Sequence, residues 1–537
     1  MKTYSEQMNR ISKDELLKGL VGYGLFPEKL PPFLSSEAFY NHIESGSNLN
    51  FTAVKETGFF EYESMRNINI PRVLGIPNPF AYFNLCECLS KNWENLCQHF
   101  YENSKDWTHK ISRIHIRKIS ENSKKIFQLD YEGTSWYWLE SGHRDNLFSM
   151  NYKDFKEDGN PVSKLLIRST YLVNADISNC FGSIYTHALS WSLVGKDIAK
   201  QERFGKWHND IDKLSSSLKQ GETHGILIGP HASSVLSEII LVAVDNELSR
   251  NYKFIRNVDD YSCYTKSHEE AERFLLDLSD ALKKYGLSLN HKKTEILKLP
   301  LVSKQNWIRE LNLCTQNLDE DVECTYPQLA AILDTAVNLM LIHKNSAILN
   351  YVIKILQYTK LTDSANEYFI DTLHHWILIY PYLIPLLEEY VFTQREISKQ
   401  KLEEVVNDIY YMGLEKKTYE AVSYALYFAI GYDLSLSTHN YEKIEKSNDA
   451  VLLLLGYLYD KKNRVGKSVL GKYKEYAKLK AENEMDKYWI FCFEVLTTGL
   501  LKDNWKKLKK DNITFVKPEF LKKLLKNEVI EEEHSKK

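Results

Sequence analysis

The chain has 537 residues and a mass of 62.8 kDa, which is too long for one compact core and corresponds to about two to four domains. Hydrophobic residues make up 43% and charged residues 26% of the chain, so the composition excludes a disordered or fibrous protein. The net charge of -3 and the pI of about 6.6 exclude a uniformly basic surface, so any surface for nucleic acid must be local.

Cysteine usage and hydropathy indicate in which cellular compartment the protein resides. The eight cysteines are scattered and form neither paired zinc-binding motifs nor a dense disulfide framework, which favours reduced thiols. The amino terminus is polar, and the longest apolar runs, such as 451–455, are far shorter than the ~20 residues of a membrane span. We therefore expect a cytoplasmic protein without a membrane partner.

Residues 1–303 mix strand-like and helical patterns with glycine and proline breaks, which predicts an α+β region. A basic cluster around 110–118 includes Arg113 and Arg117. Guanidinium groups can bind triphosphate oxygens bidentately, which makes these two arginines candidate nucleotide ligands. The alternating pattern fits equally well a half-exposed strand that presents arginine to solvent. The aromatic run 136–138 is typical of a packed sheet face and is not assigned to a site.

Two acidic motifs follow strand-like segments. Residues 171–176 form an apolar run that ends at Asp176, and Phe181 follows five positions later. Two extended runs then flank Asp259 and Asp260, which predicts a β-hairpin with these aspartates at its tip. If the two strands lie side by side, Asp176 and Asp259 converge, and carboxylate oxygens are the ligands that hard divalent cations take. An acidic dipeptide in a turn is common by itself, so the order of the motifs carries the inference.

Two further motifs surround the hairpin along the chain. In the segment 223–234, Gly225 and Gly229 permit a tight turn, and Pro230 precedes a predicted helix that begins at His231. The segment 286–294 contains Lys293, an ammonium that can meet a phosphate or protonate a leaving group. A loop before a helix and a surface lysine are the ordinary alternatives for each motif taken alone.

From residue 304 onward the pattern changes to long amphipathic windows, which predicts an all-α domain over 304–537 after a first unit over 1–303. The clearest windows are 326–342, 347–358, 402–411, 419–430 and 450–459. Their succession favours an array of helical hairpins without a strict period.

The four motifs, centred on Asp176, Gly229, Asp259 and Lys293, resemble in order and spacing blocks A to D of reverse transcriptases over residues 170–296. The resemblance implies a fingers and palm domain in which Asp176, Asp259 and Asp260 are catalytic. It implies that these aspartates, together with Ile177, hold two Mg²⁺ ions, for which Mn²⁺ can substitute. It also implies that Phe181 blocks a ribose 2'-hydroxyl, and that Phe181, Gly229 and Lys293 contact the incoming dNTP.

The segments 19–40 and 71–79 and the helical second half are similar to bacterial abortive-infection reverse transcriptases of the AbiK type. This resemblance implies a HEAT-like helical-repeat domain, antiphage defence and a homo-oligomer. It further implies a DNA product attached to a tyrosine and made without a template. Tyr4, Tyr23 and Tyr40 are candidates for that tyrosine only by their position near the amino terminus, and the sequence leaves the choice open.

Two departures from the reverse transcriptase blocks concern primer and template rather than metal. Asn257 stands where templated enzymes commonly have an aromatic residue, and 223–225 replaces a glutamine-glycine start. Two alternatives therefore stay open beside untemplated synthesis. One is an enzyme that copies a bound noncoding RNA, and the other is a catalytically idle scaffold that binds nucleic acid.

Overall fold

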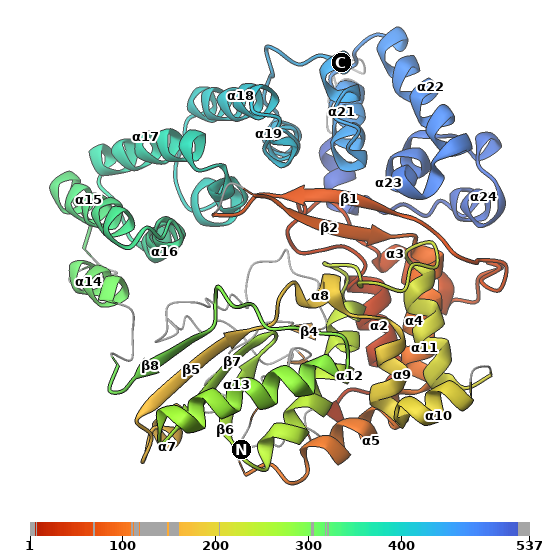
Figure 1. Cartoon of the computed structure of the whole chain (residues 1–537). Helices are drawn as coiled ribbons and strands as arrows, with labels where there is room; N and C mark the ends of the chain where they lie inside the picture. The colour runs from red at the N-terminus through yellow and green to blue at the C-terminus, as the bar shows by residue number, and fades with distance from the viewer. Residues whose placement is uncertain are drawn as a thin grey trace.

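The computed structural model describes residues 6, 8–67, 70–108, 111, 117–118, 148–149, 160–202, 205–301, 306–316, 318 and 322–524, with only the backbone for 117–118 and 148–149. Figure 1 shows a lower layer that contains the principal sheet, beneath an arch of helices from the second half of the chain. A two-stranded ribbon near the amino terminus lies between these two layers (Figure 1). The chain therefore places its second half above the sheet that carries the predicted acidic residues.

The principal sheet has four antiparallel strands in the order β6-β7-β5-β8. These strands are Lys253–Asn257 (β6), Asp260–Thr265 (β7), Tyr171–Asp176 (β5) and Glu295–Lys298 (β8). In the register of β5 and β7, Asp176 lies opposite Asp260, and on the other side of β5 Asn174 lies opposite Glu295. The strands that the sequence predicted to be neighbours are therefore paired directly.

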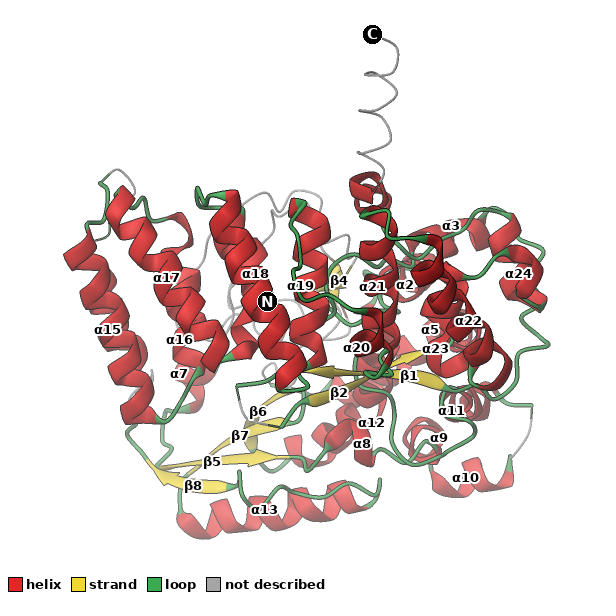
Figure 2. Ribbon diagram, turned by 90° about the horizontal axis from the view of Figure 1, so that it is seen from above, coloured by secondary structure: helices red, strands yellow, loops and turns green. Residues whose placement is uncertain are grey.

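Helix α13 (His268–Lys283) packs against β5, β7 and helix α12 (His231–Ser249). Helix α12 contacts the sheet where Asp245 and Glu238 accept hydrogen bonds from Arg256 of β6. Figure 2 shows α13 running beneath the strands. Helix α13 begins where the Ser267 side chain accepts a hydrogen bond from Glu270 N, and its buried side chains recur at helical spacing. They are Ala271, Phe274, Leu278, Ala281 and Leu282. This apolar stripe fixes α13 on the sheet.

Helices, a ribbon and short strands precede or interrupt the sheet. They are α2 (Lys13–Tyr23), α3 (Glu37–Glu44), β1 (Phe59–Ser64), β2 (Arg72–Pro77), α4 (Pro79–Lys91), α5 (Trp93–Ser104), β3 (Arg117–Lys118), β4 (Phe148–Ser149), α7 (Val162–Leu165), α8 (Cys180–Ser183), α9 (His187–Val194), α10 (Lys196–Gln201) and α11 (Trp207–Ser217). A capping box of Ser12 and Glu15 begins α2, and Asn78 caps α4 with Pro79 in its first turn. β1 and β2 pair antiparallel to form the ribbon.

The described residues after β8 form helices and no strand longer than a single bridge. The α-helices are α14 (Asn306–Thr315), α15 (Tyr326–His343), α16 (Ala347–Ile355), α17 (Asp363–Ile379), α18 (Lys399–Glu415), α19 (Tyr419–Tyr432), α20 (Tyr441–Glu445), α21 (Ala450–Lys462), α22 (Lys467–Asn483), α23 (Met485–Val495) and α24 (Asp503–Lys510). Short helices of other pitch, η1 to η4, are Leu356–Tyr358, Pro381–Leu386, Glu388–Phe392 and Thr498–Leu500. All five predicted helical windows are confirmed, and so is the mixed α+β class with a helix-rich second half.

Neighbouring helices of the second half pack in sequence, with α15 on α16, α18 on α19 and α22 on α23. Figure 1 shows them as a curved row above the sheet. The curved row is consistent with a helical array, and the assignment to a HEAT-like repeat stays a prediction. Within the part of the chain that the structure covers, no helix combines the length and the apolar character that a bilayer crossing requires.

Candidate active site

Asp176, Asp259 and Asp260 come together at one end of the principal sheet. Asp176 ends β5, Asp260 begins β7 opposite it, and Asp259 lies in the two-residue turn between β6 and β7. One carboxylate oxygen from each of the three residues lies within 4.8 Å of the others. Asp176 is buried, with 5% of its surface exposed. The convergence that the sequence predicted from the hairpin is therefore present in the structure.

The turn that carries Asp259 has an unusual backbone. Val258 has a φ of +57°, a left-handed conformation that costs a β-branched residue about 1–3 kcal/mol. Hydrogen bonds hold the turn on two sides: Ile177 N donates to Asp259 O over 3.1 Å, and Arg256 Nη1 donates to Val258 O over 2.9 Å. The position of Asp259 is therefore set by contacts with β5 and β6 as well as by the turn itself.

The carboxylate of Asp176 is held by two side chains of the segment before β8. Lys293 Nζ lies 2.8 Å from Oδ2, and Asn290 Nδ2 donates to Oδ1 over 2.9 Å. Asn290 N also donates to the main-chain oxygen of Asp176 over 2.7 Å. The sequence singled out Lys293, whereas nothing in the local pattern distinguished Asn290 within the segment 286–294. The role of Asn290 depends on the pairing of segments that are distant in the sequence.

Mutual repulsion and burial shape the charges of the site. Burial, followed by the charge of Asp259, raises the pKa of Asp260 to about 6. Burial also raises the pKa of Asp259, and the Asp176 carboxylate adds to that rise. The hydrogen bond to Asp176 raises the pKa of Lys293. Three crowded carboxylates beside one ammonium have a shortage of positive charge, which a divalent cation would supply.

The donor set fits such a cation. Carboxylate oxygens are the ligands that Mg²⁺ prefers, and the three oxygens are close enough to share ions. Ile177 directly follows Asp176, is buried, and pairs through a single bridge with Leu289. It lies beside the acidic cluster because its own N–H binds the carbonyl of Asp259.

The glycine-rich turn before α12 lies against α8 and the amino-terminal helices. Gly225 has a φ of +80°, and a Cβ added there would lie 2.8 Å from Gly182 O, so only glycine fits. Gly229 has a φ of +124°, and a Cβ added there would lie 2.5 Å from Cγ of the Pro27 ring. Ile226 N donates to Phe181 O over 2.8 Å. Phe181 is thus hydrogen-bonded to the same short segment, residues 225–229, that contains Gly229.

The structure adds one basic residue to the candidates and leaves others aside. Arg113 lies outside the described residues, and Arg117 is described only as a backbone position in β3, opposite Ser149. Arg72, at the start of β2, lowers the pKa of Asp259 by its charge, although burial dominates and the net shift is upward. No local pattern distinguished Arg72, because its relation to Asp259 arises from the placement of the ribbon above the sheet.

The candidate tyrosines lie in the amino-terminal helices where the structure describes them. Tyr4 lies outside the described residues. Tyr23 OH donates to Glu37 over 2.6 Å, and Tyr40 OH donates to Glu44 over 3.2 Å. Burial, followed by the charge of Glu44, raises the pKa of Tyr40 to about 12. These contacts do not distinguish a priming residue.

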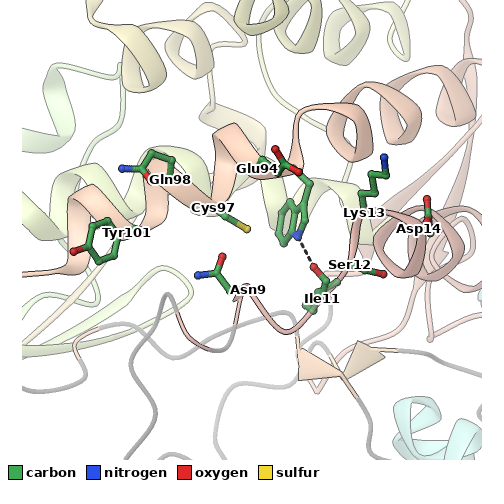
Figure 3. A pocket seen from close by; sticks show the side chains of 10 residues that line it. Asn9, Ile11, Ser12, Lys13, Asp14, Glu94, Cys97, Gln98 and Tyr101 are labelled. Atoms are coloured by element: carbon green, nitrogen blue, oxygen red, sulfur yellow. Dashed lines mark hydrogen bonds between the residues drawn. The ribbon is translucent and has the colours of Figure 1, made fainter.

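Two other features lie apart from the three aspartates. A pocket between α5 and the segment before α2 is shown in Figure 3, where Trp93 Nε1 donates to Ile11 O over 2.7 Å. A second group of possible metal ligands comprises His374, Glu404 and Asp408. Lys401 Nζ lies 3.0 Å from Glu404 Oε2 and already supplies a positive charge to that group.

The acidic residues of the site lie within a segment that matches a known protein family. Residues 138–326 match the family described as "Reverse transcriptase (RNA-dependent DNA polymerase)". A search of the curated proteins found no match. An apo telomerase from Candida Tropicalis truncated from the C-terminal domain is 16% identical, with 46% of this chain and 51% of that chain covered and a TM-score of 0.28. Apo telomerase from the same organism is 12% identical, with 78% and 75% covered and a TM-score of 0.31.

This chain spans about half the length of the first of these telomerase structures. The family match contains all three clustered aspartates together with Phe181 and Lys293. Arg113 and Arg117 lie before its first residue. By this match, residues 138–326 of the chain carry a reverse transcriptase domain.

Proposed function

We propose that the chain adds dNTPs to a growing DNA end by two-metal phosphoryl transfer at Asp176, Asp259 and Asp260. The observation that carries this proposal is the convergence of one oxygen from each carboxylate within 4.8 Å. These carboxylates, with the main-chain carbonyl of Ile177, would hold two Mg²⁺ ions, and Mn²⁺ would substitute. Two such ions, when bound, activate an attacking hydroxyl and stabilise the leaving pyrophosphate.

Other residues of the chain serve binding and proton transfer in this proposal. Lys293 gives up its contact with Asp176 when cations enter, and its ammonium then donates a proton to the leaving group. Phe181 occupies the space that a ribose 2'-hydroxyl would need. The turn at Gly229 lies along the nascent base pair, while Arg113 and Arg117 bind triphosphate oxygens.

We further propose that this synthesis serves antiphage defence of the abortive-infection type, in the cytoplasm and in a homo-oligomer. Support comes from the resemblance of 19–40, 71–79 and the helical second half to the AbiK-type enzymes. In this proposal DNA grows from a tyrosine without a template, and the product stays attached to the protein. Asn257 supports the absence of a template, since it replaces a residue that contacts primer in templated enzymes.

Copying of a bound noncoding RNA is the second candidate. The family description, an RNA-dependent DNA polymerase, favours it over untemplated synthesis. The product sequence separates the two, because a templated product follows the RNA and changes when the RNA is mutated. A catalytically idle scaffold is the third reading, and only Asn257 favours it over the three retained aspartates.

The test is incorporation of each labelled dNTP by the purified full chain with Mg²⁺, with and without copurified RNA. Asp259→Asn is expected to abolish incorporation, because an amide offers one weaker oxygen in place of a carboxylate. Asp280→Asn, an exposed residue of α13, is the matched control and is expected to retain wild-type incorporation. Incorporation that survives Asp259→Asn would refute the proposed mechanism.

The same reaction identifies the primer. A labelled product that migrates with the denatured protein and disappears after DNase digestion supports attachment to a side chain. A product released from the protein by denaturation contradicts protein priming. RNase digestion before the reaction tests the second candidate, since loss of synthesis after this step supports a copied RNA.

A further inference from the structure

Arg256 of β6 lies fully buried directly behind the hairpin turn that carries Asp259. All five N–H donors of its guanidinium group are used. Nε donates to the Asp245 carboxylate, Nη2 contacts both Asp245 and Glu238, and Nη1 contacts Glu238 Oε2 and Val258 O. The distances range from 2.8 to 3.1 Å. The guanidinium fork of Arg256 therefore joins the carboxylates of Asp245 and Glu238 to the main-chain carbonyl of Val258.

Both carboxylates belong to α12 and lie seven residues apart, which places them on one face of the helix two turns from each other. Glu238 is 1% exposed, Asp245 is fully buried, and Tyr261 OH donates to Asp245 Oδ1 over 3.2 Å. Replacing a buried ionic group of this kind by packed apolar residues is often neutral or stabilising. The arrangement therefore calls for a role other than stability.

That role follows from the turn. Val258 adopts a left-handed conformation that a β-branched residue disfavours, and Asp259 beside it lies among carboxylates of like charge. Strain and repulsion would both move Asp259 away from Asp176. The hydrogen bond from Arg256 Nη1 to Val258 O opposes this movement, and it is held in turn by a 19-residue helix.

We propose that Arg256, clamped by Glu238 and Asp245, is a positioning residue that holds the Val258 carbonyl and thereby aims Asp259 at the bound cations. The inference rests on the proposed metal site. Because α12 begins immediately after Gly229 and Pro230, the clamp also ties the glycine-rich turn to the acidic hairpin through one rigid helix. Supporting residues behind metal ligands typically change metal affinity about 10–100-fold when they are mutated.

The test is binding of Mn²⁺ alone to the full chain, followed by electron paramagnetic resonance of the free ion, with thermal unfolding as the measure of folding. Arg256→Lys retains the charge, but an ammonium offers three donors that cannot reproduce the fork. It is expected to weaken Mn²⁺ binding about tenfold. Arg395→Lys is the matched control, since Arg395 Nη1 donates to Thr359 O in the helical half. It is expected to leave Mn²⁺ binding unchanged even if it lowers the melting temperature.

The second variant separates positioning from general stability. Glycine adopts the left-handed turn without strain, so Val258→Gly added to Arg256→Lys is expected to bring Mn²⁺ binding back to within about threefold of wild type. Wild-type binding by Arg256→Lys, or no recovery in the double variant, overturns the inference. If Arg256→Lys does not fold, Glu238→Gln serves instead, because it leaves Arg256 and Asp245 with balanced charge. An unchanged Mn²⁺ midpoint in Glu238→Gln also overturns the inference.

Failure of the clamp and failure of the proposed function give different results. Mn²⁺ binding that is lost in Asp259→Asn but unchanged in Arg256→Lys overturns the clamp alone. Mn²⁺ binding that is insensitive to Asp259→Asn overturns the metal site and the clamp together. Weaker binding in Arg256→Lys, in a protein that incorporates no dNTP, supports the clamp and contradicts polymerisation.

Discussion

Lys293 has two partners in succession in the proposed reaction. Its ammonium lies 2.8 Å from Asp176 Oδ2, and 63% of its side chain is exposed, so the side chain can move away without displacing neighbouring residues. Divalent ions compete for the same carboxylate, so their entry frees the ammonium near the phosphates. A group that donates a proton in the transition state typically contributes about 10²–10⁴-fold to the rate.

Lys293→Met is therefore expected to lower the maximal rate of dNTP addition at least about 100-fold while Mn²⁺ still binds. Methionine removes the donor but keeps a side chain of similar length. Lys292→Met alters an exposed neighbouring ammonium, and this variant is expected to keep a rate near that of the wild type. Single-turnover incorporation measures both variants. Equal rates for the two would exclude proton donation by Lys293.

Phe181 is expected to set the choice between deoxyribonucleotides and ribonucleotides. Phe181→Ala opens the space beside the sugar while the aspartates stay in place. Steric exclusion of one hydroxyl is worth about 1–3 kcal/mol, so the ratio of NTP to dNTP incorporation should rise about tenfold or more. Phe392→Ala in the helical half is the control for general loss of packing. Competition between labelled ATP and dATP measures the ratio. An unchanged ratio in Phe181→Ala shows that another residue excludes the hydroxyl.

The residues that the sequence could and could not reveal differ in the range of their contacts. Asp176 and Asp259 were predictable, because each lies at the end of a strand with a recognisable local pattern. Asn290 and Arg256 were not, because their roles require contacts with segments 114 and 18 residues away. Arg72 was also not predictable from its local sequence, since its effect on the pKa of Asp259 depends on the position of the ribbon.

At the level of elements, local periodicity predicted the strands and helices better than their pairing. Alternation and turn residues located β5, β6 and β7, and amphipathic spacing located α15 and α19 within a few residues. The position of β8 beside β5 was not predictable, because parallel and antiparallel alternatives have the same local pattern. The hairpin of β6 and β7 was predictable, since a two-residue turn leaves one register.

Glu420 joins an element of the helical half to the amino-terminal ribbon. Its carboxylate, on α19, accepts a hydrogen bond from Met65 N just after β1, and only 2% of its surface is exposed. Burial raises its pKa to about 8, despite the hydrogen bonds that lower it. The folded state therefore retains this proton over a range in which an unfolded glutamate, with a pKa near 4.5, has lost it.

Stability should consequently fall as the pH rises from about 4.5 to about 8, because the folded state binds one proton more than the unfolded state in this window. The slope is at most about 1.4 kcal/mol per pH unit, since one proton is involved. Glu420→Gln keeps a neutral acceptor for Met65 N and should remove that slope above about pH 6. Below about pH 6, the raised pKa of Asp449 gives a similar slope in the wild type and in Glu420→Gln. Urea unfolding between pH 5 and pH 9 measures the difference, and parallel curves would contradict the assignment.

At the scale of the whole molecule, the last helices return to the first residues of the chain. Ser35 N donates to Phe515 O over 2.8 Å, and Lys517 N donates to Phe33 O over 2.9 Å. Asp486 accepts hydrogen bonds from Gly58 N and from the Asn78 side chain. One hydrophobic core cluster contains residues from both halves. The proposed division at 303/304 therefore separates segments that share part of their core.

Trp489 lies at the centre of this shared core. It is fully buried, and its ring lies 5.9 Å from Phe26, 5.8 Å from Phe60 and 4.9 Å from Phe515 between ring centroids. Removal of a buried aromatic ring typically costs about 3–5 kcal/mol. Because Phe26 and Phe60 belong to the amino-terminal region, that loss should be felt on both sides of the proposed boundary.

Trp489→Ala is accordingly expected to lower the melting temperature of residues 1–303 as well as that of the helices that follow them. The measurement is calorimetry together with the temperature at which Mn²⁺ binding is lost. The part of that binding which Asp259→Asn abolishes reports on the acidic site. Tyr411→Ala, which removes an aromatic ring that is 57% exposed, should change neither temperature. Two separate transitions, of which Trp489→Ala moves only the one without Mn²⁺ binding, would show that the halves unfold independently. A common shift would mean that the helical array stabilises the acidic site through its return to the amino terminus, so that the two halves unfold as one cooperative unit.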